Sequence, residues 1–115
     1  MNTTMKLNEQ VKDVLKIVDR HIRIYQRKLI HELELMAELE LNNGNLKVDC
    51  QLDDCKKNAE RYQVILANMA TIRRAIKTGH NGHIKTYLQD NNCLYSEIGK
   101  MQREIWYKCK YDFIL

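Results

Sequence analysis

The chain has no proline at all and only four glycines among its 115 residues. Proline breaks helices because it lacks a backbone N–H and its ring clashes with the preceding turn. Without proline, glycines are the main residues that can interrupt long helices. Three of the four glycines lie at two places, Gly44 and the pair Gly79 and Gly82, and they divide the chain into three stretches of similar length.

Long apolar runs are absent as well. No stretch approaches the roughly 20 apolar residues that a membrane-spanning helix needs, and the first residues lack the apolar segment of a secretory signal. We therefore expect a cytoplasmic protein without membrane contact. In that reducing compartment, the four irregularly spaced cysteines are predicted to be free thiols.

Groups that carry out catalysis are scarce. Ser96 is the only serine, and no Ser–His–Asp or Cys–His grouping stands out. The sequence also lacks a Gly-rich phosphate loop and the spacing of a DNA-binding helix-turn-helix. It therefore predicts a protein that is not an enzyme and holds no cofactor.

The histidines and cysteines raise the question of zinc. In a helical chain, Cys55 would lie about 37 Å from His80 and Cys50 still farther away, because each residue advances the helix by 1.5 Å. Cys109 could join the first two if the third helix ended beside them, but that set lacks a fourth ligand and a CxxC pair. We predict no metal site.

In all three stretches, apolar residues recur at alternating steps of three and four, which is typical of helices that bury one stripe. The three stripes are Val11, Leu15, Val18, Ile22, Tyr25, Leu29, Met36 and Leu39; Leu52, Cys55, Ala59, Tyr62, Leu66, Met69 and Ile76, flanked by Ile65 and Ile72; and Ile84, Tyr87, Asn91, Leu94, Ile98, Met101 and Ile105. Only Glu32 interrupts the first stripe. Asn91 in the third stripe either is buried and sets the register or marks a break in the helix.

The predicted fold is all-α, an antiparallel three-helix bundle of long helices that forms a single domain over residues 1–115. The helices are expected at about 5–41, 49–78 and 83–111. Short turns favour antiparallel neighbours, so the expected order is up-down-up. The alternative is an α+β fold, because the alternating residues around Asn43-Gly44 also suit a small β-hairpin.

Charge is sorted along the chain, whose net charge is +4. Antiparallel packing predicts an acidic end near Gly44, and the third helix would bring Lys100, Arg103, Lys108 and Lys110 to neutralise it. The opposite end would be basic. Its candidate phosphate-binding residues are Arg73, Arg74, Lys77, His80 and His83.

Two segments carry more apolar surface than a three-helix bundle buries. One is the end of the first helix, and the other is the aromatic C-terminal tail, in which Trp and Tyr are typical of binding sites. The predicted protein-binding residues are Glu34, Leu35, Glu38, Leu41, Trp106, Tyr107, Tyr111 and Phe113. The tail could instead pack on its own bundle or on a second copy.

The expected function is that of a helical protein-interaction module that is also a homo-oligomer. It would act as an accessory regulator or inhibitor by stoichiometric binding, like the small proteins that phages and other mobile elements encode against host defence proteins. The alternative is binding of nucleic acid or a phosphorylated nucleotide at the basic end.

Overall fold

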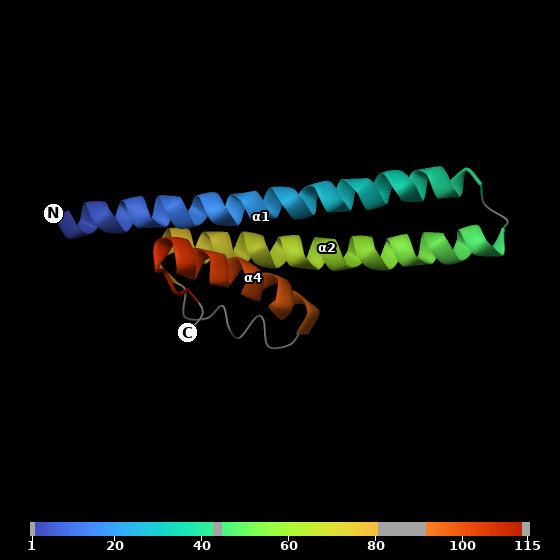
Figure 1. Cartoon of the computed structure of the whole chain (residues 1–115). Helices are drawn as coiled ribbons and strands as arrows, with labels where there is room; N and C mark the ends of the chain where they lie inside the picture. The colour runs from blue at the N-terminus through green and yellow to red at the C-terminus, as the bar shows by residue number, and fades with distance from the viewer. Residues whose placement is uncertain (1, 43–44, 81–91, 114–115) are drawn as a thin grey trace.

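The described residues of the computed structural model, 2–42, 45–80 and 92–113, form three helices and no strand (Figure 1). These helices are α1 (Asn2–Glu40), α2 (Leu46–Thr78) and α4 (Asn92–Cys109). The predicted all-α bundle is confirmed. The β-hairpin alternative is wrong, because the residues up to Glu40 and from Leu46 onward are helical.

The start of α2 shows why the predicted boundary at residue 49 is three residues late. Asn45 has an extended backbone, and its side-chain oxygen accepts a hydrogen bond from the Lys47 N–H at 2.9 Å. This is the geometry of an N-cap, and asparagine is among the residues most favoured there. Asp49 lies in the first turn, where its negative charge still suits the helix dipole.

The end of α2 matches the prediction from Gly79. This glycine has a left-handed backbone, with φ of 79°. The His80 N–H donates to the Ala75 carbonyl at 2.8 Å, and the Gly79 N–H donates to the Ile76 carbonyl at 3.4 Å. This pair of bonds is the Schellman motif, which ends a helix and satisfies its last carbonyls.

The third helix runs in an unexpected direction. At one end of α4, Gln10 of α1 donates to the Cys109 carbonyl at 2.7 Å, and at the other end the Tyr25 hydroxyl donates to Glu97. Thus α4 is antiparallel to α1 and runs in the same direction as α2 (Figure 1). The expected up-down-up order is wrong. The predicted helical positions Ile84, Tyr87 and Asn91 lie outside the described residues.

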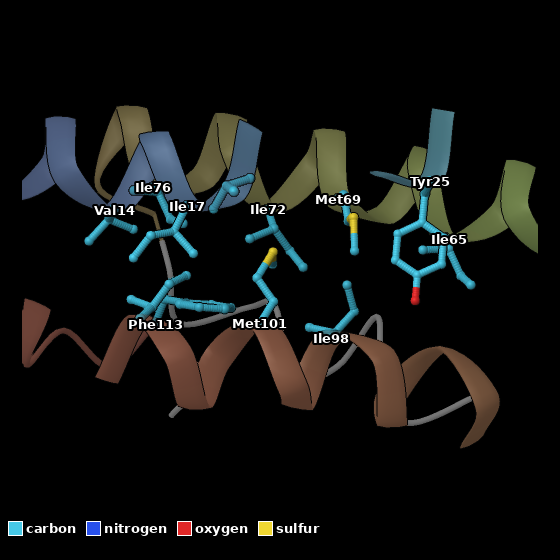
Figure 2. Close-up of a cluster of buried hydrophobic side chains, with 12 residues drawn as sticks. Val14, Ile17, Tyr25, Ile65, Met69, Ile72, Ile76, Ile98, Met101 and Phe113 are labelled. Atoms are coloured by element: carbon cyan, nitrogen blue, oxygen red, sulfur yellow. The ribbon is translucent and has the colours of Figure 1, made fainter. Parts of the chain in front are cut away.

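The core lies where the three helices meet. Ile98, Met101 and Ile105 of α4 are completely buried. Figure 2 shows the side chains of Ile98 and Met101 pointing toward α1 and α2. Opposite them, the most deeply buried residues of the first two helices are Val14, Val18, Ile65, Met69, Ile72 and Ile76. The predicted stripe on α1 did not include Val14 or Ile17. Both are buried because α1 contacts two helices here and so needs a wider apolar face.

The tail folds back onto the bundle. Lys110 has φ of 53°, so the chain turns sharply just after α4 ends. This turn returns Phe113 to the core, where its side chain is fully buried, and Tyr111 packs beside it half-buried. Phe113 is therefore a core residue, which corrects its assignment to a protein-binding surface.

The molecule is elongated, with extents of 65 × 24 × 22 Å. Figure 1 shows α4 alongside only the half of the α1–α2 hairpin that holds the start of α1 and the end of α2. We call the other half, α1 residues 29–40 and α2 residues 46–58, the distal arm. In this arm, two helices pack on each other without α4.

Candidate functional site

A groove of about 280 Å³ lies between α1 and α2 in the distal arm. Its lining combines apolar and polar side chains: Glu32, Leu35, Leu39, Gln51, Asp54, Cys55 and Asn58. We call it the distal groove.

The distal groove continues the groove between α1 and α2 in which α4 packs. On α2, steps of three and four lead from the buried Ile72, Met69 and Ile65 through Tyr62 to Asn58 and the other groove residues. The same spacing on α1 leads from Tyr25, which bonds to α4, to Glu32, Leu35 and Leu39. The two helices therefore present one continuous face, of which α4 covers only part.

Glu32 is the unusual residue of this groove. Asn58 Nδ2 donates to Glu32 Oε1 at 3.4 Å. No N–H or O–H donor of the described residues reaches the other oxygen, Oε2, although it is buried. A buried polar atom without a partner costs about 1–3 kcal/mol. The groove therefore holds an acceptor that a bound molecule could satisfy.

Cys55 lies beside Glu32 and is buried. Burial raises the pKa of the Cys55 thiol, and so do its hydrogen bond to Glu32 and the negative charges of Glu32 and Asp54. A raised pKa keeps the thiol protonated and therefore unreactive. Cys55 thus contributes shape and an apolar wall to the groove.

The rim of the distal arm is acidic, as the sequence predicted. Glu34, Glu38 and Asp54 are exposed, and no ion pair among the described residues engages them. The expected neutralisation by the third helix is wrong. Because α4 runs toward the start of α1, it carries Lys108 and Lys110 away from this end.

The predicted protein-binding residues separate into two groups. Glu34, Leu35, Glu38 and Leu41 belong to the end of α1, where Leu35 lines the groove and Leu41 is 86% exposed. Trp106 and Tyr107 lie in the last turn of α4, whose final residue, Cys109, accepts a hydrogen bond from Gln10 of α1. That level is about 43 Å along α1 from Leu39, at 1.5 Å per residue. The two groups cannot form one continuous surface on a single copy.

Trp106 and Tyr107 form a smaller surface of their own. They are 48% and 72% exposed, and the Lys110 ammonium lies 5.9 Å and 6.0 Å from their ring centroids. A shallow pocket beside Trp106 is also lined by Gln102, Arg103 and Asp112. Tyr111 is half-buried against the core, so it contributes little to this surface.

At the basic end, Arg73 donates to Asp19 at 2.7 Å, which engages it within the chain. Arg74 and Lys77 are exposed. His80 is exposed too, with its Nδ1 at 3.2 Å from the Thr78 hydroxyl. His83 lies outside the described residues.

The proposed meeting of Cys109 with Cys50 and Cys55 does not occur. Cys109 lies beside Gln10, at the end of the molecule opposite the distal arm, and burial raises the pKa of its thiol. Within the part of the chain that the structure describes, no group of three or more His, Cys, Asp or Glu side chains could hold a metal ion.

Of the residues that line the groove, the sequence reasoning predicted only Leu35 and missed Glu32, Leu39, Gln51, Asp54, Cys55 and Asn58. A signal for the groove was present, because Glu32 is the one polar residue in the apolar stripe of the first helix.

None of the described helices is long and apolar enough to cross a bilayer. Comparison with protein-family models, curated proteins and solved structures finds no match.

Proposed function

We propose that this protein is a non-enzymatic interaction module that binds a helix of a partner protein in the distal groove. One observation carries the proposal. The groove between α1 and α2 that α4 fills continues into the distal arm, where none of the described residues covers it and where Glu32 Oε2 is buried without an N–H or O–H donor from those residues. A helix lying in such a groove is a common mode of protein recognition.

The groove defines the chemistry of the partner helix. Apolar side chains at steps of three and four would pack on Leu35 and Leu39, as Ile98, Met101 and Ile105 of α4 pack on the core. A lysine, arginine or amide N–H would donate to Glu32 Oε2, and a charged donor would make the stronger bond. Basic residues beside the apolar stripe would complement the acidic rim of the arm.

Binding of this kind needs no turnover. The protein would act stoichiometrically, as an accessory regulator or inhibitor that occupies or bridges its partner. The sparse catalytic groups of the sequence and the protonated thiol of Cys55 support this reading. Small proteins of this type, including those that mobile elements direct against host defence proteins, are the class we propose.

The test compares two leucine substitutions at the end of α1. Leu39→Asp places a charge in the groove, whereas Leu41→Asp changes an 86% exposed side chain that does not line it. We expect the wild type and Leu41→Asp to retain the same stoichiometric protein partner in quantitative affinity capture, and Leu39→Asp to lose it. Equal retention by Leu39→Asp and Leu41→Asp would contradict the groove as the binding site.

Glu32→Leu separates the carboxylate from the shape of the groove. The change removes a half-buried carboxylate whose Oε2 is buried without an N–H or O–H donor among the described residues, so we expect the free energy of unfolding to rise by about 1 kcal/mol. We expect affinity for the partner to fall, because the acceptor for the partner's donor is gone. Urea titration and a binding titration measure the two effects, and unchanged affinity would remove Glu32 from the proposal.

The second candidate function is nucleic-acid or nucleotide binding at the basic end. The direction of α4 favours it, because Lys108 and Lys110 come to the same end of the molecule as Arg74 and Lys77. The ion pair of Arg73 with Asp19 weighs against it. Arg74→Glu with Lys77→Glu should abolish a salt-dependent affinity for oligonucleotides, and binding that survives this pair of changes would rule the candidate out.

A further inference from the structure

The outer face of α1 carries an exposed apolar stripe. Ile30 and Leu33 are 54% and 45% exposed, and Ala37 is exposed one turn further along the helix. Their spacing of three and four residues places them on one side of the helix. The groove residue Leu35 is five positions from Ile30, about 140° around the helix, so this stripe is a different surface from the distal groove.

The charged residues beside the stripe are basic on the N-terminal side of Ile30 and acidic on its C-terminal side. Arg23 and Arg27 lie on its N-terminal side, and Glu34 and Glu38 lie on its C-terminal side; all four are exposed. Each pair has like charges four residues apart, an arrangement that destabilises an isolated helix. Among the described residues, no ion pair engages any of the four.

We propose that this face is an interface between two copies of the chain, with their α1 helices antiparallel about a two-fold axis beside Ile30. In that arrangement Arg27 of each copy comes within about one residue of the level of Glu34 in the other. Arg23 likewise approaches Glu38, and the two Ile30 side chains meet at the axis. The like-charged pairs within each helix become opposite-charged pairs between helices.

Charge complementarity selects a second copy as the occupant. A two-fold interface joins the same patch on both subunits, so the patch must complement itself. The basic block, apolar centre and acidic block of α1 meet this condition when the helices are antiparallel. A parallel pair would place like charges together. The dimer uses Glu34 and Glu38 of the acidic rim but none of the residues that line the distal groove, and it does not depend on the proposed function.

The test is the mass of the full chain in solution, measured by sedimentation equilibrium over a range of concentrations. The wild type is expected to dimerise, and added salt is expected to weaken the dimer because its charge pairs are exposed. Arg23→Glu with Arg27→Glu makes the face acidic throughout, and Glu34→Arg with Glu38→Arg makes it basic throughout. We expect each double variant alone to dimerise at least about tenfold more weakly than the wild type.

Two further samples distinguish pairing from misfolding. An equimolar mixture of the two double variants should form a heterodimer, and the chain with all four substitutions should dimerise like the wild type, because the charge pattern is then inverted but again self-complementary. Circular dichroism verifies that each variant is helical. A wild type that stays monomeric up to about 1 mM, or double variants that dimerise as the wild type does, would overturn the proposal. So would a quadruple variant that remains monomeric.

Discussion

At the junction of α1 with α4, a single glutamate joins several charged side chains. Glu104 of α4 accepts a hydrogen bond from Arg20, and its carboxylate lies 3.4 Å from His21 Nε2 and 3.9 Å from Lys108 Nζ. His21 is half-buried here. Burial lowers the pKa of His21, and the positive charges of Arg20 and Lys108 lower it further. His21 is therefore neutral in the folded protein at pH 7.

This lowered pKa predicts that the protein loses stability as the pH falls below about 6.5, the ordinary pKa of histidine. Below that pH, His21 of the unfolded chain binds a proton more readily than His21 of the folded chain, so protonation favours unfolding. In His21→Gln, the free energy of unfolding should fall less between pH 7.5 and 5.5. Urea titrations at several pH values measure this slope.

The matched control is His31→Gln, which removes an exposed histidine from the same helix and should keep the wild-type slope. If His21→Gln showed the full wild-type slope, desolvation of His21 would not be the source of the acid sensitivity.

The distal groove contains a polar group that, unlike Glu104, is not fully satisfied by its neighbours. There Glu32 Oε2 is buried without an N–H or O–H donor from the described residues, which the chain tolerates at a cost in stability.

Among the three helices, α4 is the shortest and is attached to the rest of the bundle by the fewest residues. It contains 18 residues, against 39 in α1 and 33 in α2. Its attachment depends on the buried residues Ile98, Met101 and Ile105, aided by Phe113 from the tail. Because a single apolar stripe attaches α4, shortening one side chain of that stripe should lower the free energy of unfolding considerably.

Met101→Ala is predicted to lower the free energy of unfolding by about 2–5 kcal/mol, since it leaves a cavity in the fully buried core. Tyr107→Ala, at a 72% exposed position on the same helix, should cost less than about 1 kcal/mol. Urea denaturation, followed by the fluorescence of the single tryptophan, Trp106, gives both values. Equal effects of the two substitutions would contradict the docking of α4 through this stripe.

The whole molecule combines a three-helix bundle at one end with a two-helix arm at the other. Near α4, α2 buries Ile65, Met69, Ile72 and Ile76, whereas most α2 residues from 46 to 58 are exposed or half-buried. Fewer buried apolar contacts mean that a segment opens more readily than the rest of the fold. The arm that we propose as the docking site is therefore the less stable half.

Hydrogen exchange should detect this difference within one helix. We predict that the amides of residues 50–56 in α2 exchange through local opening, faster than those of residues 66–76, which should exchange only when the protein unfolds globally. Native-state exchange at low protein concentration avoids any contribution from a dimer. Uniform protection along α2 would show that the arm is as stable as the bundle.

Much of the fold was predictable from the sequence because helical signals are local. Hydrogen bonds four residues apart, the absence of proline and the apolar steps of three and four indicate helices wherever they occur. The conformational freedom of Gly79 predicts the end of α2 in the same way. The sorting of charge along α1 could also be read directly, as could the acidic character of the distal arm.

The packing partners were not predictable in this way. An apolar stripe such as Ile98, Met101 and Ile105 fits a neighbouring groove in either direction, so only the assembled bundle decides that α4 runs alongside α2. That direction determines which half of the hairpin is covered, and the return of the tail decides that Phe113 is core rather than surface. The distal groove follows from both, because a helix face becomes a binding site only where no other part of the chain covers it.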